Sequence, residues 1–549
     1  PLFAQQFLTP NNMDGLSIDP NARPAVYSST TQEVLAAIAL TAAPAMHAMS
    51  MGALQMGLPK IAEEFGVSGG EVTWLLSAYT LTSGSFLLLF GKVSDLIGRK
   101  KVLVASFIWF ALVSLICGFM KNFIAFCVLR GLQGLAGAAC VTSSVGILGH
   151  TYNNSKRKNR VFACYGGGQP TGFIIGIIAG GICANFIGWR AILFFLTILY
   201  TLFTIAAIFC VPADPPVHSK RAELKRLDYL GAVLITSGFG LLIFGITQAE
   251  SVKGSWSNPM VYSTIIAGII GVCSFIGWES RIKDPLMPLS VWKYRQFALV
   301  MLIVVLAQMA FPVTLQFYTT LWFQKVRKVS PLMTAVYFLP QAIVGIMVNA
   351  FTAFTLHKIP GTVFLIVGML AFFIASILWA LQPVTMTYWA MAFPSMCLSV
   401  VGADLVYMVV NLFAVESVGK KDQSMAGGVL NTVIQIGSSL GLAFTAAISM
   451  SVESKQPNYK EWKGTDLEGR ILVPGYRAVF WFSVAATATG FFLACFTSIG
   501  RQGEKTKADD GLEMGSVSTS SGSESDLGDG QKKEMVVVGK TPLTEEKAV

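Results

Sequence analysis

The chain has 549 residues, of which 53% are hydrophobic and only 13% are charged, whereas an average soluble protein has about 25% charged residues. This composition excludes an ordinary soluble protein and indicates a chain that lies mostly in a lipid bilayer. The formal net charge is +10 at pH 7. Because such cations can face the anionic inner leaflet of a membrane, no nucleic-acid partner is expected.

Apolar blocks of about 20 residues, the length of α-helix that crosses a bilayer, alternate with short polar connectors along the chain. In chain order, the predicted membrane-spanning helices lie at residues 34–58, 73–91, 102–120, 122–147, 162–186, 191–211, 229–249, 260–278, 297–319, 332–354, 361–380, 386–412, 427–449 and 478–497. The sequence therefore predicts an all-α polytopic membrane protein with fourteen transmembrane helices.

Two longer polar connectors divide these helices into groups of six, two and six. One is rich in Pro and charge and begins at residue 212, and the other ends just before residue 297. The last part of the chain contains SVSTSSGSESDLGDG, a composition with too few apolar residues to fold. The expected domains are an N-terminal tail at 1–33, an N-terminal six-helix half at 34–211, connectors with two inserted helices at 212–296, a C-terminal six-helix half at 297–499 and a disordered tail at 500–549.

An even number of helices places both ends of the chain on the same side of the membrane. Most Lys and Arg residues of the connectors fall on the side that carries residues 91–101, and such residues concentrate on the cytoplasmic side of membrane proteins. We therefore expect both termini and this connector to be cytoplasmic. The expected location is the plasma membrane as a multi-pass protein, with the vacuolar membrane as the alternative.

The connector between the second and third predicted helices has the sequence GKVSDLIGRKK at residues 91–101. Gly91, Asp95, Gly98, Arg99 and Lys100 resemble the signature loop of the major facilitator superfamily, whose members are secondary transporters. The resemblance implies that Asp95 pairs with a helix N-terminus and nearby cations, and so locks the cytoplasmic ends of the two halves while the transporter faces outward. The alternative is a topology signal, which explains the cations but not the acid or the glycines.

Two further stretches resemble motifs of the same superfamily. The sequence LRGLQG in the fourth helix places Arg130 within the membrane, and GQPTGFIIGIIAGG in the fifth helix resembles the antiporter motif of drug exporters. The usual Gly-Pro pair of that motif is here Gly176-Ile177. Its glycines serve either close helix packing or an export-specific role. The motif-like residues of the fifth helix are Gly168, Pro170, Gly172, Gly176, Gly180 and Gly181.

The fourteen-helix count, GWRAILFF at the sixth helix, VGADLVY at the twelfth and SMAGGVLNTVIQIGSSLGLAF at the thirteenth together point to one branch of this superfamily. They resemble the fungal fourteen-span drug:proton antiporters, in particular the aminotriazole-resistance-like group. The resemblance implies the major facilitator fold, with two six-helix halves and two extra central helices.

Two formally charged side chains and one imidazole lie within the predicted helices, where a buried charge is costly and commonly functional. Asp404 is the only carboxylate there, and burial favours its neutral form, so that it can bind and release a proton. We predict that Asp404 carries the coupled proton; the alternative is a structural hydrogen bond. Arg130 keeps its proton and is predicted to act electrostatically on an acid. His47 is either a third coupling residue or a hydrogen-bonded packing residue.

Polar side chains within the predicted helices are candidates to line a substrate cavity. A cavity with few fixed charges and many Phe and Met side chains suits neutral or weakly cationic amphipathic compounds. The candidates are Gln308, Gln341, Asn349, Tyr407, Asn411, Asn431 and Gln435.

The predicted function is secondary active transport across the membrane, in which a proton-coupled antiporter exports small amphipathic or toxic compounds by alternating access. A proton-coupled importer or facilitator of a small nutrient is the alternative, and a membrane sensor or enzyme is a third possibility. An enzyme is not expected, because carboxylate clusters and metal-spaced ligands are lacking in the helices. The expected partners are a small-molecule substrate, protons and the lipid bilayer, with no cofactor, no metal and a monomeric state.

Overall fold

Fourteen helices of the computed structural model are long and apolar enough to cross a membrane. The structure describes residues 23–24, 26–67, 69–152, 156–212, 228–249, 255–282, 285–287, 289–355, 358–416, 423–457 and 468–500. Within these residues the predicted all-α fold and its number of spanning helices are confirmed. The Ser-rich C-terminal tail lies outside the described residues.

The first six spanning helices form one group, which we call the N-terminal half. They are α1 (Thr30–Phe65), α3 (Trp74–Ile97), α4 (Arg99–Gly118), α5 (Phe123–Thr151), α6 (Lys156–Phe186) and α7 (Arg190–Cys210), with the short α2 (Gly69–Val72) before α3. Within this half, α1 packs against α6 and α7, α3 against α5, and α4 against α5 and α7.

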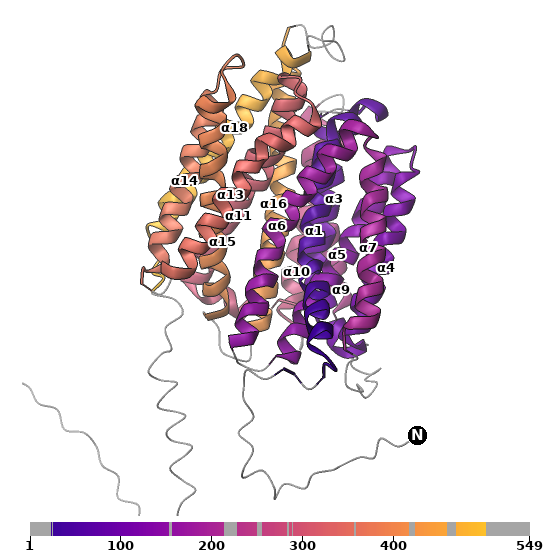
Figure 1. Cartoon of the computed structure of the whole chain (residues 1–549). Coiled ribbons are helices and arrows are strands. Elements are labelled where there is room, and N and C mark those ends of the chain that lie inside the picture. Colours follow the sequence, from indigo (N-terminus) through magenta and orange to yellow (C-terminus); the bar gives the residue numbers. More distant parts are fainter. Residues whose placement is uncertain are drawn as a thin grey trace, which may run out of the picture. The chain divides into compact units, whose positions relative to one another are not determined.

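The last six spanning elements form the C-terminal half, and Figure 1 shows them in orange and yellow beside the indigo-to-magenta N-terminal half. α14 packs against α15 and α18, and α11 against α16 and α18. The elements are α11 (Arg295–Gln308) continued by η4 (Met309–Tyr318), α12 (Thr319–Leu321) and η5 (Trp322–Val326), α13 (Pro331–Thr355), α14 (Gly361–Leu381), η6 (Tyr388–Ala392) continued by α15 (Phe393–Glu416), α16 (Gln423–Glu453) and α18 (Glu468–Ala494).

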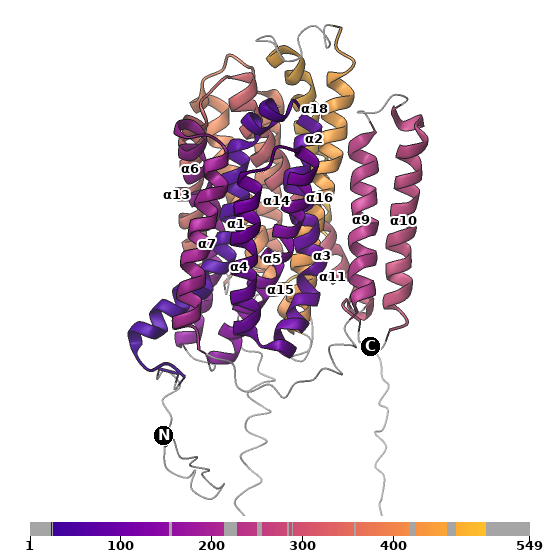
Figure 2. The ribbon, with the colours of Figure 1, turned by 90° about the vertical axis from the view of Figure 1, so that its right-hand side faces the viewer.

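Two inserted helices, α9 (Tyr229–Gln248) and α10 (Pro259–Glu279), stand side by side at one edge of the bundle (Figure 2). The short η2 (Ser255–Ser257) precedes α10, and η3 (Leu289–Lys293) leads into α11. Glycines allow the pair to approach closely, because a Cβ at Gly238 or Gly268 would meet backbone atoms of the partner helix. α9 also packs against α3 and α16.

The helix bundle has two ends, which correspond to the two sides of the membrane. The motif face is the end that carries Gly91–Lys101, between α3 and α4, and the opposite face is the other end. Short connectors alternate between the two faces, so α1 begins at the motif face and ends at the opposite face. The two halves meet where α3 packs against α16 and where α6 packs against α13.

Some helices extend beyond the apolar runs from which they were predicted. α1 ends at Phe65 instead of residue 58, and α18 begins at Glu468, well before residue 478. The sequence boundary followed hydropathy, whereas a helix can continue through polar turns beyond the bilayer core. In α1 the added turn includes Lys60, whose ammonium donates to the backbone O of Ala184 in α6 at 2.5 Å.

The spanning element that begins with α11 contains two π-helical segments, η4 and η5. π-Helical turns are rare, and they occur often at functional sites. In η4 the chain also contains Pro312, which has no N–H to donate to the helical ladder. Because Pro312 cannot donate, one backbone carbonyl of the preceding turn does not receive the N–H that an ordinary helix would supply.

Candidate functional site

Arg130 of α5 is completely buried within the N-terminal half. Its guanidinium donates to the backbone O of Leu75 at 3.0 Å, to the side-chain O of Gln133 at 2.6 Å and to the hydroxyl of Ser50 at 3.3 Å. The guanidinium carbon lies 4.5 Å from the ring centre of Tyr79, a cation–π contact. All of these partners are neutral, so the described residues hold the charge by hydrogen bonds and an aromatic face.

His47 of α1 connects the residues around Arg130 to the C-terminal half, through Tyr79 on one side and Gln435 on the other. Its Nδ1 lies 2.7 Å from the Tyr79 hydroxyl, and its Nε2 lies 2.9 Å from the side-chain amide of Gln435 in α16. A side chain at Gly137 would collide with the imidazole, which explains a glycine at that position of α5. The residue is therefore hydrogen-bonded on both ring nitrogens and bridges the two halves.

Asp404 of α15 lies in the C-terminal half, away from the Arg130 cluster. Its carboxylate accepts a hydrogen bond from the side-chain amide of Asn349 in α13 at 3.0 Å. Gly345, one turn before Asn349 on α13, leaves room for the carboxylate, because a Cβ there would lie 3.2 Å from Asp404 Oδ2. Among the described residues the partner of Asp404 is thus a neutral amide, and the structure does not bring Arg130 and Asp404 together.

Two of the other cavity candidates form hydrogen bonds with a different helix, and two form them with their own helix. Gln308 accepts from Ser438 at 3.2 Å, and Tyr407 donates to Gln169 of α6 at 3.1 Å, which is a contact between the halves. The other group bonds to its own helix: the amide of Asn411 donates to the Tyr407 backbone O at 2.8 Å, and that of Asn431 to the Gly427 backbone O at 2.9 Å. Asn411 and Asn431 are therefore the weaker cavity candidates.

Buried hydrogen bonds join the halves toward the opposite face, and we call them the opposite-face contacts. The side-chain amide of Gln55 in α1 donates to the backbone O of Gln316 at 2.9 Å and to the hydroxyl of Thr320 at 2.7 Å. Gln316 belongs to π-helical η4. A further pair, Thr80 of α3 and Ser439 of α16, has its hydroxyl oxygens 2.5 Å apart.

Gln341 extends these contacts into the C-terminal half. Its side-chain O accepts from Gln316 at 3.0 Å, and its amide donates to Ser399 of α15 at 3.1 Å. Gln341 was predicted from the sequence as a cavity residue, whereas Gln55 and Gln316 were not. Both are amide side chains inside predicted helices, as Gln341 is. The criterion that selected Gln341 would have selected them as well if it had been applied to every helix.

The motif loop lies on a sharp connection between α3 and α4, where Gly98 has a φ of +117°, a conformation that favours glycine. Arg99 pairs with Asp95 at 2.7 Å, and the side chain of Asp95 is 57% exposed. Lys100 donates to the backbone O of Ile208 at 2.9 Å and of Val211 at 2.6 Å, at the end of α7. The described contacts of Asp95 therefore remain within the N-terminal half.

The predicted latch would join Asp95 to the C-terminal half, where α16 begins at the motif face. The side chains of residues 421–426, in and just before the first turn of α16, lie outside the described part. An exposed Asp95 paired with Arg99 fits a state in which the latch is released. The gating role remains a prediction.

The glycines of α6 pack mainly against α1 within one half. A Cβ at Gly168, Gly172, Gly176 or Gly180 would meet backbone atoms of Thr41, Ala45, Met49 or Ala53, respectively. Gly181 differs, because a Cβ there would lie 2.8 Å from Ala335 Cβ of α13, across the interface between the halves. Pro170 lies on an exposed side of α6. The contacts favour close packing for the stripe and leave an export-specific role untested.

Buried carboxylates also occur at helix ends, beyond the predicted spans. Glu33, at the start of α1, pairs with Arg157 at 2.8 Å and accepts from the Tyr152 hydroxyl at 3.3 Å. Burial raises the pKa of Tyr152, so this hydroxyl stays a donor. Glu279 and Glu453 end α10 and α16 and are also buried. Span boundaries drawn from hydropathy stopped short of these residues, and so the sequence analysis overlooked them.

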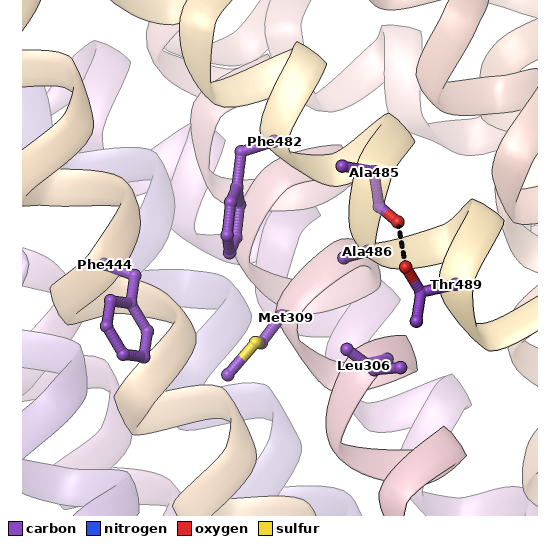
Figure 3. A pocket seen from close by; sticks show the side chains of 7 residues that line it. All are labelled: Leu306, Met309, Phe444, Phe482, Ala485, Ala486 and Thr489. Atoms are coloured by element: carbon purple, nitrogen blue, oxygen red, sulfur yellow. Dashed lines mark hydrogen bonds between the residues drawn. The ribbon is translucent and has the colours of Figure 1, made fainter.

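A pocket of about 260 Å³ lies between α11, η4, α16 and α18 (Figure 3). Six of its seven lining side chains are apolar, among them Phe444, Phe482 and Met309. The exception is Thr489, which donates to the backbone O of Ala485 at 2.8 Å. This pocket shares no residue with the candidate sites and offers no titratable group.

A family comparison connects this geometry to known proteins. The model of the Major Facilitator Superfamily matches residues 40–442, which run from α1 through the inserted pair and into α16 of the C-terminal half. The chain belongs to the major facilitator superfamily. The fold and the relatives are those of major facilitator transporters, and the protein is therefore a transporter in a membrane that it crosses many times.

Fungal relatives of this major facilitator transporter cover most of its length. It is 29% identical to the low affinity ammonium transporter of Saccharomyces cerevisiae over 83% of this chain and 86% of that protein. It is also 29% identical to the efflux pump terJ of Aspergillus terreus over 80% and 83%. The aminotriazole resistance protein of Saccharomyces cerevisiae is 28% identical over 80% and 78%. The aminotriazole-resistance resemblance of the sequence is thereby confirmed.

Solved structures share the fold of this transporter. The nucleoside transporter NupG superposes with a TM-score of 0.55 at 13% identity, over 84% of this chain and 100% of that one. A bacterial homologue of the human lysosomal transporter Spinster, in an inward-facing and occupied conformation, has a TM-score of 0.58 at 15% identity, over 87% and 100%. At these identities the likeness establishes the fold.

Proposed function

We propose that this transporter is a proton-coupled antiporter that exports small amphipathic compounds by alternating access. The motif face is cytoplasmic in this proposal, as are both termini. The N-terminal half (34–211) and the C-terminal half (297–499) rock against each other around a central cavity. The protein works as a monomer in the plasma membrane.

The observation that carries the proposal is the environment of Asp404. Its carboxylate is held by the amide of Asn349, and a neutral donor can stay in place whether or not the acid carries a proton. A carboxylate paired with a cation would have to break that ion pair on protonation, at considerable cost in a buried site. Asp404 therefore suits repeated binding and release of a proton.

The fixed charge of Arg130 complements this titratable site. It is fully buried and held by neutral groups of the N-terminal half, so its positive field persists through the cycle. His47 bridges Tyr79 and Gln435 of the two halves. These contacts support a substrate cavity lined by His47, Gln435, Gln308 and Tyr407. The hydrogen bonds of His47 with Gln435 and of Tyr407 with Gln169 join the halves and change when the halves separate.

Export is supported by the names of several relatives. An efflux pump of Aspergillus terreus, the aminotriazole resistance protein and a multidrug transporter of Aspergillus fumigatus are all similar to this chain over most of its length. A proton that enters down about 100 mV supplies roughly 2.3 kcal/mol, and one pH unit adds about 1.4 kcal/mol. Because a tenfold ratio costs about 1.4 kcal/mol, one proton sustains a gradient of roughly a few hundredfold for a neutral solute.

Import or facilitation of a small nutrient is the second candidate. The relative named a low affinity ammonium transporter is as similar to this chain as the efflux pump is. Fold alone does not set the direction of transport. Flux measured in both directions with a pH gradient of either sign distinguishes the two candidates.

The test is solute flux in proteoliposomes with an imposed pH gradient and a panel of amphipathic compounds. The Asp404→Asn variant keeps the shape of the side chain and its contact with Asn349 but cannot titrate. It should insert and fold normally and lose uphill, proton-driven export, whereas downhill exchange survives. The matched control is Asp404→Glu, which keeps a titratable carboxyl and should retain part of the coupling.

The outcome that contradicts the proposal is equally direct. If Asp404→Asn exports compounds against a gradient with the pH dependence of the parent, Asp404 is not the proton carrier. If the parent moves compounds only inward under the same gradient, the nutrient importer replaces the exporter.

A further inference from the structure

The inserted pair, α9 and α10, has no task in the proposed exchange, yet α9 occupies a critical place. It packs against both α3 and α16, the two helices that meet across the halves (Figure 2). In alternating access the two halves move relative to each other. A helix that contacts both must therefore keep its contacts with one half and slide over the other.

The contacts of α9 with α16 are apolar. Near the opposite face, Ile243 and Ile246 pack in one cluster with Ala443 and Ala447 of α16. Further along, Ile235 packs in a cluster with Ile436 of α16. Apolar contact is not directional, so it permits one helix to shift along another at little cost.

α9 also meets α3 through apolar clusters that contain Leu81 and Leu89 of α3, but at the motif face the segment after α10 adds a directional polar bond to α3. Lys92 of α3 donates its ammonium to the backbone O of Pro285 at 2.8 Å, in the segment that follows α10. The next residue, Leu286, is buried against Leu89 of α3 and Ala232 of α9. α3, α9 and this segment thus share one small core beside the gating motif.

Two buried acids tie the ends of the inserted pair to the same place. Asp228 accepts from the backbone N–H of Gly231 at 2.8 Å and from the indole N–H of Trp278 at 2.8 Å, which joins the start of α9 to the end of α10. Glu279 accepts from the backbone N–H of Leu286 at 3.2 Å. Both acids are 3% exposed.

Glu279 lies near the Asp228 carboxylate, whose charge repels its own, and near the Lys92 ammonium, whose charge offsets part of that repulsion. Around Lys92, therefore, the ends of α9 and α10 and the segment 285–287 are held together and to α3, by hydrogen bonds, charge and a shared apolar core.

We propose that α9 and α10 are a fixed attachment of the N-terminal half, fastened at the motif face by Lys92, and that the pair slides over α16 during the transport cycle. Lys92 directly follows Gly91 of the gating motif, but its side chain serves the inserted pair. The pair covers the seam between α3 and α16 in both states, while it moves as one body with α3.

The test is pulsed electron paramagnetic resonance on the full chain in lipid nanodiscs, with the nine native cysteines replaced and spin labels placed in pairs. The label positions are Ile97 at the end of α3, Leu230 at the start of α9 and Val363 at the start of α14, which are 43%, 47% and 45% exposed. The distance between Ile97 and Leu230 should show one narrow distribution. Any change in the distance between Ile97 and Val363 should be accompanied by a similar change in the distance between Leu230 and Val363.

The fastening is tested by removing the charge of Lys92. Lys92→Met should broaden the distribution between Ile97 and Leu230, and the effect should grow when Glu279→Gln is added. The matched control is Lys101→Met, which removes an exposed cation of the same motif and should leave that distribution unchanged.

Two results overturn the proposal. The first is a distribution between Ile97 and Leu230 that stays as narrow in Lys92→Met as in the Lys101→Met control. The second is a parent protein in which the distance between Leu230 and Val363 is fixed and that between Leu230 and Ile97 varies, which would attach the pair to the C-terminal half. Neither readout requires a transported compound, so both are independent of the proton-coupled export proposed above.

Discussion

The halves are joined by buried hydrogen bonds toward the opposite face and by an exposed one nearer the motif face. Between these ends, the hydroxyl of Thr432 in α16 donates to the backbone O of Gly84 in α3 at 3.1 Å, which is also a buried contact. Gln55, Gln316 and Thr320 are each at most 4% exposed and form two hydrogen bonds between the halves. Nearer the motif face, the contact between Tyr407 and Gln169 is exposed. The difference indicates a molecule that is closed at the opposite face and less tightly joined at the motif face, which is the inward-facing state if the motif face is cytoplasmic.

The contrast also shows why the two ends need different chemistry. Buried hydrogen bonds are costly to leave unmade, so the opposite-face contacts hold the halves together without any charge. The motif face instead carries Asp95 and its cations, which keep their hydration when they separate. A transporter with one gate of each kind can open the charged end to water without exposing unsatisfied amides.

A reporter cysteine makes the comparison measurable. Ser439→Cys, in a variant without native cysteines, places a thiol of similar size at a buried position of α16 beside Thr80. It should react with a membrane-impermeant maleimide added outside intact cells only when the opposite face opens. The rate of this reaction reports the population of the outward-facing state.

The largest change in reporter labelling is expected from a substitution at Gly181. Gly181→Val places a side chain against Ala335 and the backbone O of Pro331 in α13, because even a Cβ would lie 2.8 Å and 3.0 Å from these atoms. The closed opposite face cannot form around that side chain, so labelling of the reporter should rise to near completion. The measurement is the maleimide reaction rate in cells.

Gly176→Val is the matched control for Gly181→Val. Its side chain would collide with Met49 of α1 inside the N-terminal half, so it should reduce thermal stability without selecting the outward-facing state. Equal reporter labelling in the two folded variants would show that Gly181 has no special place at the interface.

The second-largest change in reporter labelling is expected from a substitution at Gln55. Gln55→Leu removes two hydrogen bonds between the halves, each of which contributes about 0.5–1.5 kcal/mol. A shift of about 1.4 kcal/mol changes the ratio of states roughly tenfold, and the reporter should react faster by about that factor. Gln324→Leu is the control, because its bond to the Met56 backbone O is longer, at 3.3 Å. A reporter rate unchanged by Gln55→Leu would mean that packing alone closes this face.

The parts of this structure that could be predicted are those that a local sequence pattern reveals, such as a run of apolar residues or a charge within such a run. Hydropathy alone predicted the fourteen helices, because each must fill a bilayer with apolar residues. Asp404 and Arg130 stood out as charges in apolar runs. Gln55 and Gln316 left only a weak signal, since a single amide in a helix is common, and nothing in the residue pattern predicted that the two would meet across the halves.

Long-range pairing is the other part that the sequence does not contain in readable form. Which acid lies beside Arg130 was left open, and the structure surrounds that residue with Gln133, Ser50 and Tyr79 instead. The glycines of α6 were visible as a stripe, but only the packed helices show that Gly181, unlike the four glycines that face α1, meets α13. Periodicity gives the face of a helix, whereas the partner of that face is set by the whole fold.

The third prediction disturbs the motif face at Asp95. If Asp95 is a latch of the outward-facing state, Asp95→Ala removes a contact that only that state makes and shifts the balance toward the inward-facing state. Reporter labelling should then fall by up to about tenfold, the effect of roughly 1.4 kcal/mol, while the protein reaches the membrane at normal levels. Lys101→Ala is the control, because an exposed charge contributes little. Equal labelling in both variants would reduce the motif to a topology signal.

The smallest effect is expected at Tyr407, where the halves share an exposed hydrogen bond. Tyr407→Phe removes the hydroxyl that donates to Gln169 at 3.1 Å and keeps the ring. Because water can replace an exposed partner, the change should alter the free-energy difference between the two states by no more than about 0.5 kcal/mol, and reporter labelling by roughly twofold or less. The same chemical loss, a side-chain hydrogen bond between the halves, is thus expected to matter several times more at Gln55, where water is excluded. If Tyr407→Phe changes the labelling as much as Gln55→Leu does, then burial does not set the strength of the two ends, and the motif face is held as firmly as the opposite face.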